Sequence, residues 1–166
     1  MTVPADTTMC PMNTPHDLIH RFFWCLDERD HDGVLATLAS DVVWFRQGQR
    51  HAGLDGVSAA LQRRSPTLFV RHVISNVFEM SPRDIAASDA TLRQVDGDLR
   101  PGASGDIVLS YYLSGYTFDN GTPVQAPCHG GHLHKMSWVR TRLSRFDNGW
   151  RIVDKHMLPL FVFDSA

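Results

Sequence analysis

Several features that would assign this chain to a familiar class of protein are scarce in its sequence. Its three cysteines, Cys10, Cys25 and Cys128, are odd in number and show no C-x-x-C spacing. We therefore expect neither a disulfide framework nor a zinc finger, and we interpret the three as free thiols. No run of about 18 apolar residues occurs, and the N-terminus lacks the basic start and apolar stretch of a signal peptide. These absences predict a cytoplasmic protein without a membrane partner.

The sequence also lacks a large excess of charge of one sign and any familiar cofactor-binding motif. The 16 basic and 18 acidic residues leave a formal net charge of −2, so no global field would recruit nucleic acid. The sequence has no Walker loop, no G-x-G-x-x-G and no H-E-x-x-H motif, and we predict no cofactor. Potential zinc ligands do occur in CHGGHLH, residues 128–134. Their spacing fits no familiar closed site, so we interpret the segment as a polar connector and predict no metal.

What the chain does contain is enough apolar material for one core. Its 166 residues, 43% of them hydrophobic, match the usual size of a single domain. Residues 1–15 are rich in proline and threonine and have no apolar periodicity, so we predict a flexible lead-in there. The domain is expected to occupy residues 16–166.

Helical periodicity marks the first part of this domain. An amphipathic helix is predicted over 15–30, with Thr14 as its cap and Pro15 at its first position. Its apolar stripe contains Leu18, Ile19, Phe22, Phe23 and Leu26. A short second helix, capped by Asp32, is expected to form a hairpin with the first. A third helix is predicted to begin near Gly53 and to end before Pro66.

A period of two dominates the rest of the sequence. A β-branched and aromatic run predicts a strand at 42–45, and a polar turn follows at 47–49. Residues 69–80 predict a long strand. One of its faces carries His72, Ile74, Asn76, Phe78 and Met80. Further strands are expected at about 84–95, 106–118, 132–147 and 149–162, with Asp147-Asn148-Gly149 as a hairpin turn. Helices followed by antiparallel strands are typical of an α+β fold.

This order of elements, with several short motifs, resembles the nuclear transport factor 2-like superfamily and its SnoaL-like group. The motifs are Leu26-Asp27, Asp41-Val42-Val43-Trp44, Arg71-His72-x-x-Ser75-Asn76 and Asp147-Asn148-Gly149-Trp150. The resemblance implies a cone-shaped, cystatin-like fold. In it, a curved antiparallel sheet is wrapped around an N-terminal helical hairpin plus a third helix.

Within the superfamily, the motifs are most similar to the branch of hexachlorocyclohexane dehydrochlorinase and scytalone dehydratase. In that branch an aspartate at the end of the first helix orients a histidine, which removes a proton from a substrate carbon. The matching residues here are Asp27 and His72, and Asn76 also matches the motif. Lys155 resembles the position of a cationic group near the leaving group. The resemblance therefore implies an Asp-His general-base dyad.

The residues themselves leave two interpretations of the dyad open. Asp27 continues the Ile19 and Phe23 line of the first helix, which should be buried, although an aspartate at a helix end can also be simply solvated. His72 shares a face with apolar residues, as either a general base or a satisfied core histidine. We predict a carboxylate oxygen of Asp27 within about 3.2 Å of a ring nitrogen of His72. The other ring nitrogen should face a cavity.

Aromatic and amide side chains are the other substrate-binding candidates. Trp44 and Phe23 could form an apolar wall, although both are also ordinary core residues. Tyr112 and Tyr116 share a strand face, and a phenol could polarise a carbonyl. Asn76 could hydrogen-bond the substrate, and Lys155 could help a leaving group.

Two classes of function remain open from the sequence. The first is a cofactor-independent lyase or isomerase, similar to a dehydratase, dehydrohalogenase or cyclase, that acts on a small hydrophobic or aromatic molecule. The second is a non-catalytic ligand binder or accessory subunit, like the β subunit of ring-hydroxylating dioxygenases. In that case Arg140, Arg142 and Arg145 would mark a subunit interface. A closed cavity beside the dyad would favour the enzyme, and a shallow or plugged one the accessory role.

Apolar side chains on both alternations of the last strands point to self-association. Val139 and Leu143 lie on one alternation, and Met136 and Trp138 on the other. A sheet covered by helices on one side must cover its other side as well. We therefore predict a homodimer or higher homo-oligomer built on the outer sheet surface.

Overall fold

The computed structural model of the protein describes residues 14–163. The lead-in predicted for residues 1–15 therefore lies almost entirely outside the described residues. In chain order the elements are α1 (Pro15–Asp27), α2 (His31–Ala36), β1 (Leu38–Arg46), β2 (Gln49–Ala52), α3 (Gly53–Gln62), β3 (Phe69–Glu79), α4 (Pro82–Asp96), β4 (Ile107–Phe118), β5 (His132–Phe146) and β6 (Gly149–Val162). Within the part of the chain that is described, no helix combines the length and apolarity needed to cross a membrane.

The helical hairpin of α1 and α2 depends on local capping and one close approach. Thr14 caps α1 by accepting a hydrogen bond from the Asp17 backbone N–H at 3.1 Å. The prediction that Asp32 caps α2 is wrong, because Asp30 does so, accepting from the Gly33 N–H at 2.8 Å. A Cβ on Gly33 would lie 2.2 Å from the Asp30 carboxylate. Glycine is thus needed where α2 meets its own cap.

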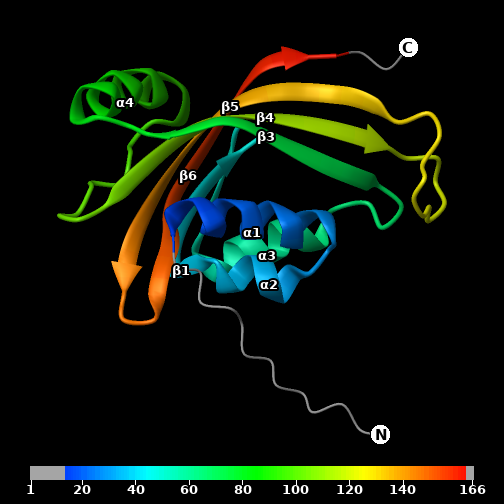
Figure 1. Ribbon diagram of the computed structural model, residues 1–166, viewed down its shortest axis with the longest axis horizontal. Coiled ribbons are helices and arrows are strands. Elements are labelled where there is room, and N and C mark those ends of the chain that lie inside the picture. Colours follow the sequence, from blue (N-terminus) through cyan, green and yellow to red (C-terminus); the bar gives the residue numbers. More distant parts are fainter. Residues whose placement is uncertain (1–13, 164–166) are drawn as a thin grey trace, which may run out of the picture.

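The six strands form one sheet in the order β2-β1-β6-β5-β4-β3. The β1–β6 pair is parallel, and the other neighbours are antiparallel. Figure 1 shows the sheet curving over α1, α2 and α3 on its concave side. Phe22, Phe23 and Leu26 of α1 are at most 6% exposed in the core beneath this curve. The predicted α+β fold, with a curved sheet around a helical hairpin and a third helix, is confirmed.

A bulge in β3 divides that strand into two parts that face differently. Asn76 has a φ of 54°, and the pairing with β4 shifts register between Ser75 and Phe78. His72 and Ile74 point inward as predicted. Beyond the bulge the alternation reverses, so that Val77 packs on the core while Asn76 and Phe78 are exposed. The single continuous face predicted for 72–80 is therefore wrong after Ile74.

The strand predicted at 84–95 is also wrong, because this segment is the helix α4. Ser81 and Asp84 form a capping box, and Pro82 stands at the first helical position. Only Ser88 and Leu92 of the helix are buried. Two buried positions are too few to make a helical period stand out in the sequence.

Charged residues attach α4 to the outer, convex face of the sheet, opposite α1 (Figure 1). Asp89 is ion-paired with Arg140, which is 1% exposed. Asp96, at the end of α4, lies 2.6 Å from Nδ1 of His156. On the other side of this ring, Nε2 of His156 lies 2.7 Å from a carboxylate oxygen of Asp154, outside hydrogen-bond alignment. Burial lowers the pKa of His156, but the two aspartate carboxylates in contact with its ring raise the pKa by more.

This arrangement changes the interpretation of the arginine run on β5. Arg140 pairs with Asp89 of α4, and Arg142 lies 3.8 Å from Asp106. Both arginines are buried inside the molecule, so the prediction that they mark a subunit interface is wrong. Arg145 alone is exposed, with its guanidinium 5.8 Å from the ring of Trp150.

Candidate active site

Asp27 and His72 meet where the end of α1 reaches β3. An Asp27 carboxylate oxygen, Oδ1, lies 2.5 Å from Nδ1 of His72. The other, Oδ2, accepts the backbone N–H of His72 at 2.7 Å. The side chains of His72 and Asp27 are only 15% and 10% exposed, so bulk water competes little for these contacts. The predicted contact is confirmed, while the catalytic role of the pair stays a prediction.

The carboxylate also decides which ring nitrogen of His72 can act as a base. An acceptor at Nδ1 places the proton of the neutral ring on Nδ1, which leaves the lone pair on Nε2. Gly115 lies directly opposite His72 in the β3–β4 pairing. A Cβ on Gly115 would lie 4.0 Å from Nε2, so the glycine keeps this edge of the ring uncovered.

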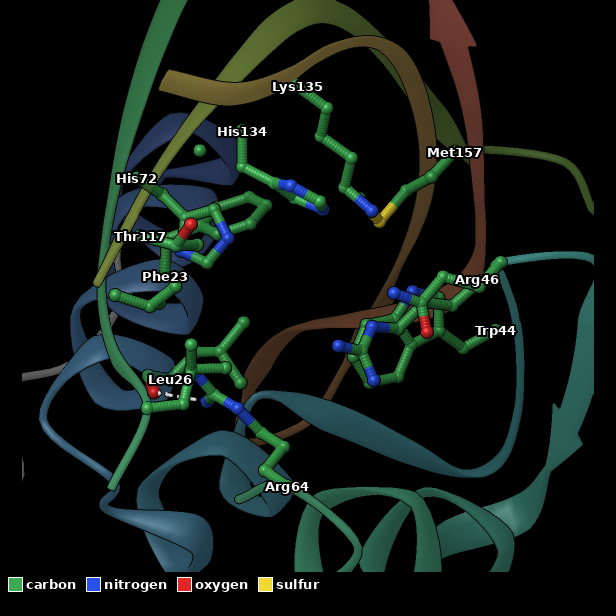
Figure 2. A pocket seen from close by; sticks show the side chains of 14 residues that line it. Phe23, Leu26, Trp44, Arg46, Arg64, His72, Thr117, His134, Lys135 and Met157 are labelled. Atoms are coloured by element: carbon green, nitrogen blue, oxygen red, sulfur yellow. Dashed lines mark hydrogen bonds between the residues drawn. The ribbon is translucent and has the colours of Figure 1, made fainter. Parts of the chain in front are cut away.

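The ring of His72 lines a cavity of about 180 Å³ between α1 and the sheet (Figure 2). Its apolar wall contains Phe23 and Leu26 from α1 and Trp44 from β1. Leu68, Val70 and Met157 complete this wall. The remaining lining is polar and comprises Arg46, Gln47, Arg64, Thr117, His134 and Lys135, with Gly115 between them and His72. A cavity with an apolar wall and a few convergent polar groups is typical of small-molecule sites.

The polar side of the cavity is rich in cations, a feature that the sequence analysis does not predict. The cavity is bordered on three sides in Figure 2 by Arg46, Arg64 and Lys135, here called the cation cluster. Burial lowers the pKa of Arg46. Burial, followed by the charges of Arg46 and Arg29, lowers the pKa of Arg64 to about 10. Burial and the charge of Arg46 also lower the pKa of Lys135.

The remaining predicted substrate-binding residues divide between the two faces of the sheet. Phe23 and Trp44 line the cavity as predicted, whereas Asn76 is exposed on the bulge of β3. Tyr112 and Tyr116 were expected in the pocket, but Gly115 and Thr117 show that β4 turns its other alternation inward. Tyr116 instead lines a groove on the outer side of the sheet.

Lys155 lies behind the cavity wall and not in it. The side chain is 1% exposed, and Nζ donates to the Tyr111 hydroxyl at 2.5 Å. Nζ also lies 4.5 Å from the centroid of the ring of Phe23, which lines the cavity. Burial lowers the pKa of Lys155 well below its usual value, which favours the neutral amine. Lys155 thus supports Phe23, and the expectation that it lines the pocket is not met.

The sequence analysis missed several lining residues, and they differ in whether a sequence pattern could have predicted them. Arg46 stands two positions after Trp44 and shares its strand face, so alternation could have found it. On β5 the register passes from Gly115–Lys135 to Tyr116–Leu133 and skips His134. This bulge brings two consecutive side chains to the cavity. Arg64 has no local signal, since its position depends on the hydrogen bond from its Nη1 to the distant Leu26 carbonyl, at 2.8 Å.

The CHGGHLH segment does not converge on one site. His134 borders the cavity, whereas Cys128 and His129 border the outer groove. Within residues 14–163, no group of three or more His, Cys, Asp or Glu side chains has an arrangement that could hold a metal ion.

Comparison with known proteins supports the same fold. Among solved structures, the chain is similar to a scytalone dehydratase-like protein of Novosphingobium aromaticivorans, with a TM-score of 0.65, 8% identity and coverage of 91% of this chain and 85% of that one. It is also similar to ActVI-ORFA of Streptomyces coelicolor (TM-score 0.63, 16% identity, coverage 87% and 93%). A third is a Catenulispora acidiphila protein in complex with S-DNPA (TM-score 0.61, 13% identity, coverage 87% and 89%). No curated protein matches the chain in sequence.

The family assignment comes from the sequence itself. The family described as SnoaL-like domain matches residues 16–156, a span that includes the helical hairpin, the dyad and all but the end of the sheet. This chain therefore belongs to the SnoaL-like family.

Proposed function

We propose that this protein is a cofactor-independent lyase or isomerase in which His72 removes a proton from a substrate carbon. One observation carries the proposal. The Asp27 carboxylate holds His72 by both its ring and its backbone, and the ring lines the cavity. This is the arrangement that a positioned general base requires.

The chemistry follows from the position of the proton. Nε2 of His72 takes the proton from carbon, and the C–H electron pair either forms a double bond or delocalises into a neighbouring carbonyl. In the first case a leaving group departs from the adjacent atom, which is an elimination. In the second an enolate forms and is reprotonated elsewhere, which is an isomerisation. Asp27 stabilises the imidazolium formed in either path, and the cation cluster is placed to stabilise a developing oxyanion.

Two further observations favour an enzyme over an accessory subunit. The accessory role predicts a shallow or plugged pocket, whereas a cavity of about 180 Å³ adjoins the dyad. The chain also shares its fold with a scytalone dehydratase-like protein and with a relative in complex with a small molecule.

A probe reaction can test proton removal without knowledge of the natural substrate. The base-promoted opening of 5-nitrobenzisoxazole removes the ring C–H proton, forms the nitrile and breaks the N–O bond to release a coloured phenolate. His72→Ala should lower the rate by about 10²- to 10⁴-fold, the usual contribution of a positioned base. The matched control is His20→Ala, because His20 is exposed on α1 away from the cavity. Equal rates for wild type and a folded His72→Ala variant would refute the proposal.

A further inference from the structure

Among the described residues, the cavity wall carries positive charge and no carboxylate of its own. Its 14 lining residues include the cation cluster and no aspartate or glutamate. The nearby carboxylate of Asp27 is already engaged by the ring and backbone of His72. Within residues 14–163, no ion pair involves a member of the cation cluster. Partly buried cations are normally paired, so this arrangement is incomplete by itself.

The cations also disfavour one another. The charge of Arg46 acts against the protonated forms of both Arg64 and Lys135, and lowers the pKa of each. The charge of Asp27, which lies outside the lining, offsets part of this repulsion at Arg64. An anion placed among the three would replace repulsion by attraction, and the partly enclosed wall would make that attraction stronger than in water.

Hydrogen-bond donors in the cluster are held in place but not fully used. Arg64 donates one hydrogen bond to the Leu26 carbonyl, while its Nε is buried and has no hydrogen-bond partner among the described residues. Arg46 lies with its guanidinium carbon 5.6 Å from the centroid of the Trp44 ring, which orients it along the cavity wall. A planar guanidinium fixed in this way matches the two oxygens of a carboxylate.

We infer that the substrate is an organic anion: an apolar carboxylic acid whose carboxylate binds the cation cluster while its hydrocarbon body rests on Phe23 and Trp44. This inference specifies the substrate class of the proposed function. Only the statement that this ligand is the substrate of His72 rests on that function. The hydrophobic or aromatic molecule expected from the sequence matches only the apolar part of the cavity wall. A carboxylate on that molecule would match the cationic part.

Two probes of nearly the same shape, one anionic and one neutral, test the inference. Binding of cinnamate and of the neutral cinnamamide is measured by calorimetry on the wild-type protein at low and at high salt. Cinnamate should bind at least about tenfold more tightly at low salt, and added salt should reduce this preference. Equal affinities, or no binding of either probe at millimolar concentration, would overturn the inference.

Matched variants locate the preference within the cavity. Lys135→Met and Arg64→Met should each reduce the preference for cinnamate severalfold, whereas Arg63→Met should leave it unchanged. Arg63 is the exposed neighbour of Arg64 and lies outside the cavity lining. Arg64→Met also breaks the bond to the Leu26 carbonyl, so Lys135→Met keeps the test valid if that variant does not fold. A control variant that weakens the preference as much as Lys135→Met would contradict the assignment.

The same measurements separate this inference from the proposed function. His72→Ala should retain the preference for cinnamate, because the base does not hold the carboxylate. If 5-nitrobenzisoxazole is not opened but the preference persists, the catalytic proposal fails and the anion site stands. If the probe is opened by His72 and the preference is absent, only the anion site fails.

Discussion

Replacing Asp27 by asparagine preserves the shape of the side chain while removing one of its two acceptors. In the protein, Oδ1 lies 2.5 Å from Nδ1 of His72 and Oδ2 accepts the backbone N–H at 2.7 Å. The amide has one oxygen and one NH₂ group, so it can keep only one of these contacts. If the oxygen stays with the backbone, the NH₂ group donates to Nδ1. The ring proton then moves to Nε2, and the lone pair facing the cavity is lost.

The expected magnitude follows from these two arrangements. A histidine held in the wrong tautomer by the same substitution in a Ser-His-Asp triad loses about 10⁴-fold in kcat. In the other arrangement, the tautomer survives, but the backbone N–H of His72 loses its acceptor, which destabilises the fold by about 1–3 kcal/mol. We therefore expect Asp27→Asn to lower the rate by about 10²- to 10⁴-fold, or roughly 3–5 kcal/mol in activation free energy.

The assay is the opening of 5-nitrobenzisoxazole at neutral pH, with circular dichroism to confirm that each variant is folded. Asp32→Asn is the control, because Asp32 is an exposed carboxylate in the first turn of α2. Its rate should match that of the wild type. A folded Asp27→Asn protein with nearly wild-type activity would show that the carboxylate does not orient the base.

Three further predictions concern stability and assembly. Asp89→Ala should lower the free energy of unfolding by about 3 kcal/mol in denaturant titrations, because it leaves the charge of the buried Arg140 without a partner. Asp41→Ala breaks an exposed ion pair and should lower it by less than about 1 kcal/mol. Because the pKa of His156 is raised above 6.5, the folded state binds the imidazole proton more tightly than the unfolded state does. The resulting stabilisation is complete below pH 6.5 and is lost as the pH rises through the folded pKa. His156→Gln should therefore flatten this decline of the free energy of unfolding at higher pH. A flat wild-type profile above pH 6.5 would contradict that assignment. The predicted homodimer should appear in light scattering at high micromolar concentration, and Phe161→Asp, at the exposed apolar end of β6, should weaken it; a monomeric wild type would count against self-association.

Local periodicity was sufficient wherever burial repeats along the chain. The stripe of α1 is visible because Phe22, Phe23 and Leu26 all face one core. The first half of β3 alternates as an ideal strand, so the inward direction of His72 could be predicted. Family motifs then linked Asp27 to His72, and their contact lies at the predicted distance.

Periodicity failed where the partners of a segment are charged or strained. The helix α4 buries few apolar side chains. It is held to the sheet by contacts of Asp89 with Arg140 and of Asp96 with His156, about 50 to 60 residues later in the chain. Asn76 itself has a positive φ, and after it Val77 packs on the core while Phe78 is exposed. A bulge of this kind has no signature in hydrophobicity, because it changes the register and not the composition.

The sequence by itself determined the helical hairpin, most strands and the two members of the dyad, because each is encoded in a short pattern or motif. Only the tertiary structure decided the chemical character of the pocket. Arg46 ends one strand, Arg64 follows a helix, and Lys135 lies on another strand about 70 residues later. The tertiary fold brings the three around one cavity. No local pattern records such a convergence, since charged residues far apart in sequence look solvated until the fold places them together.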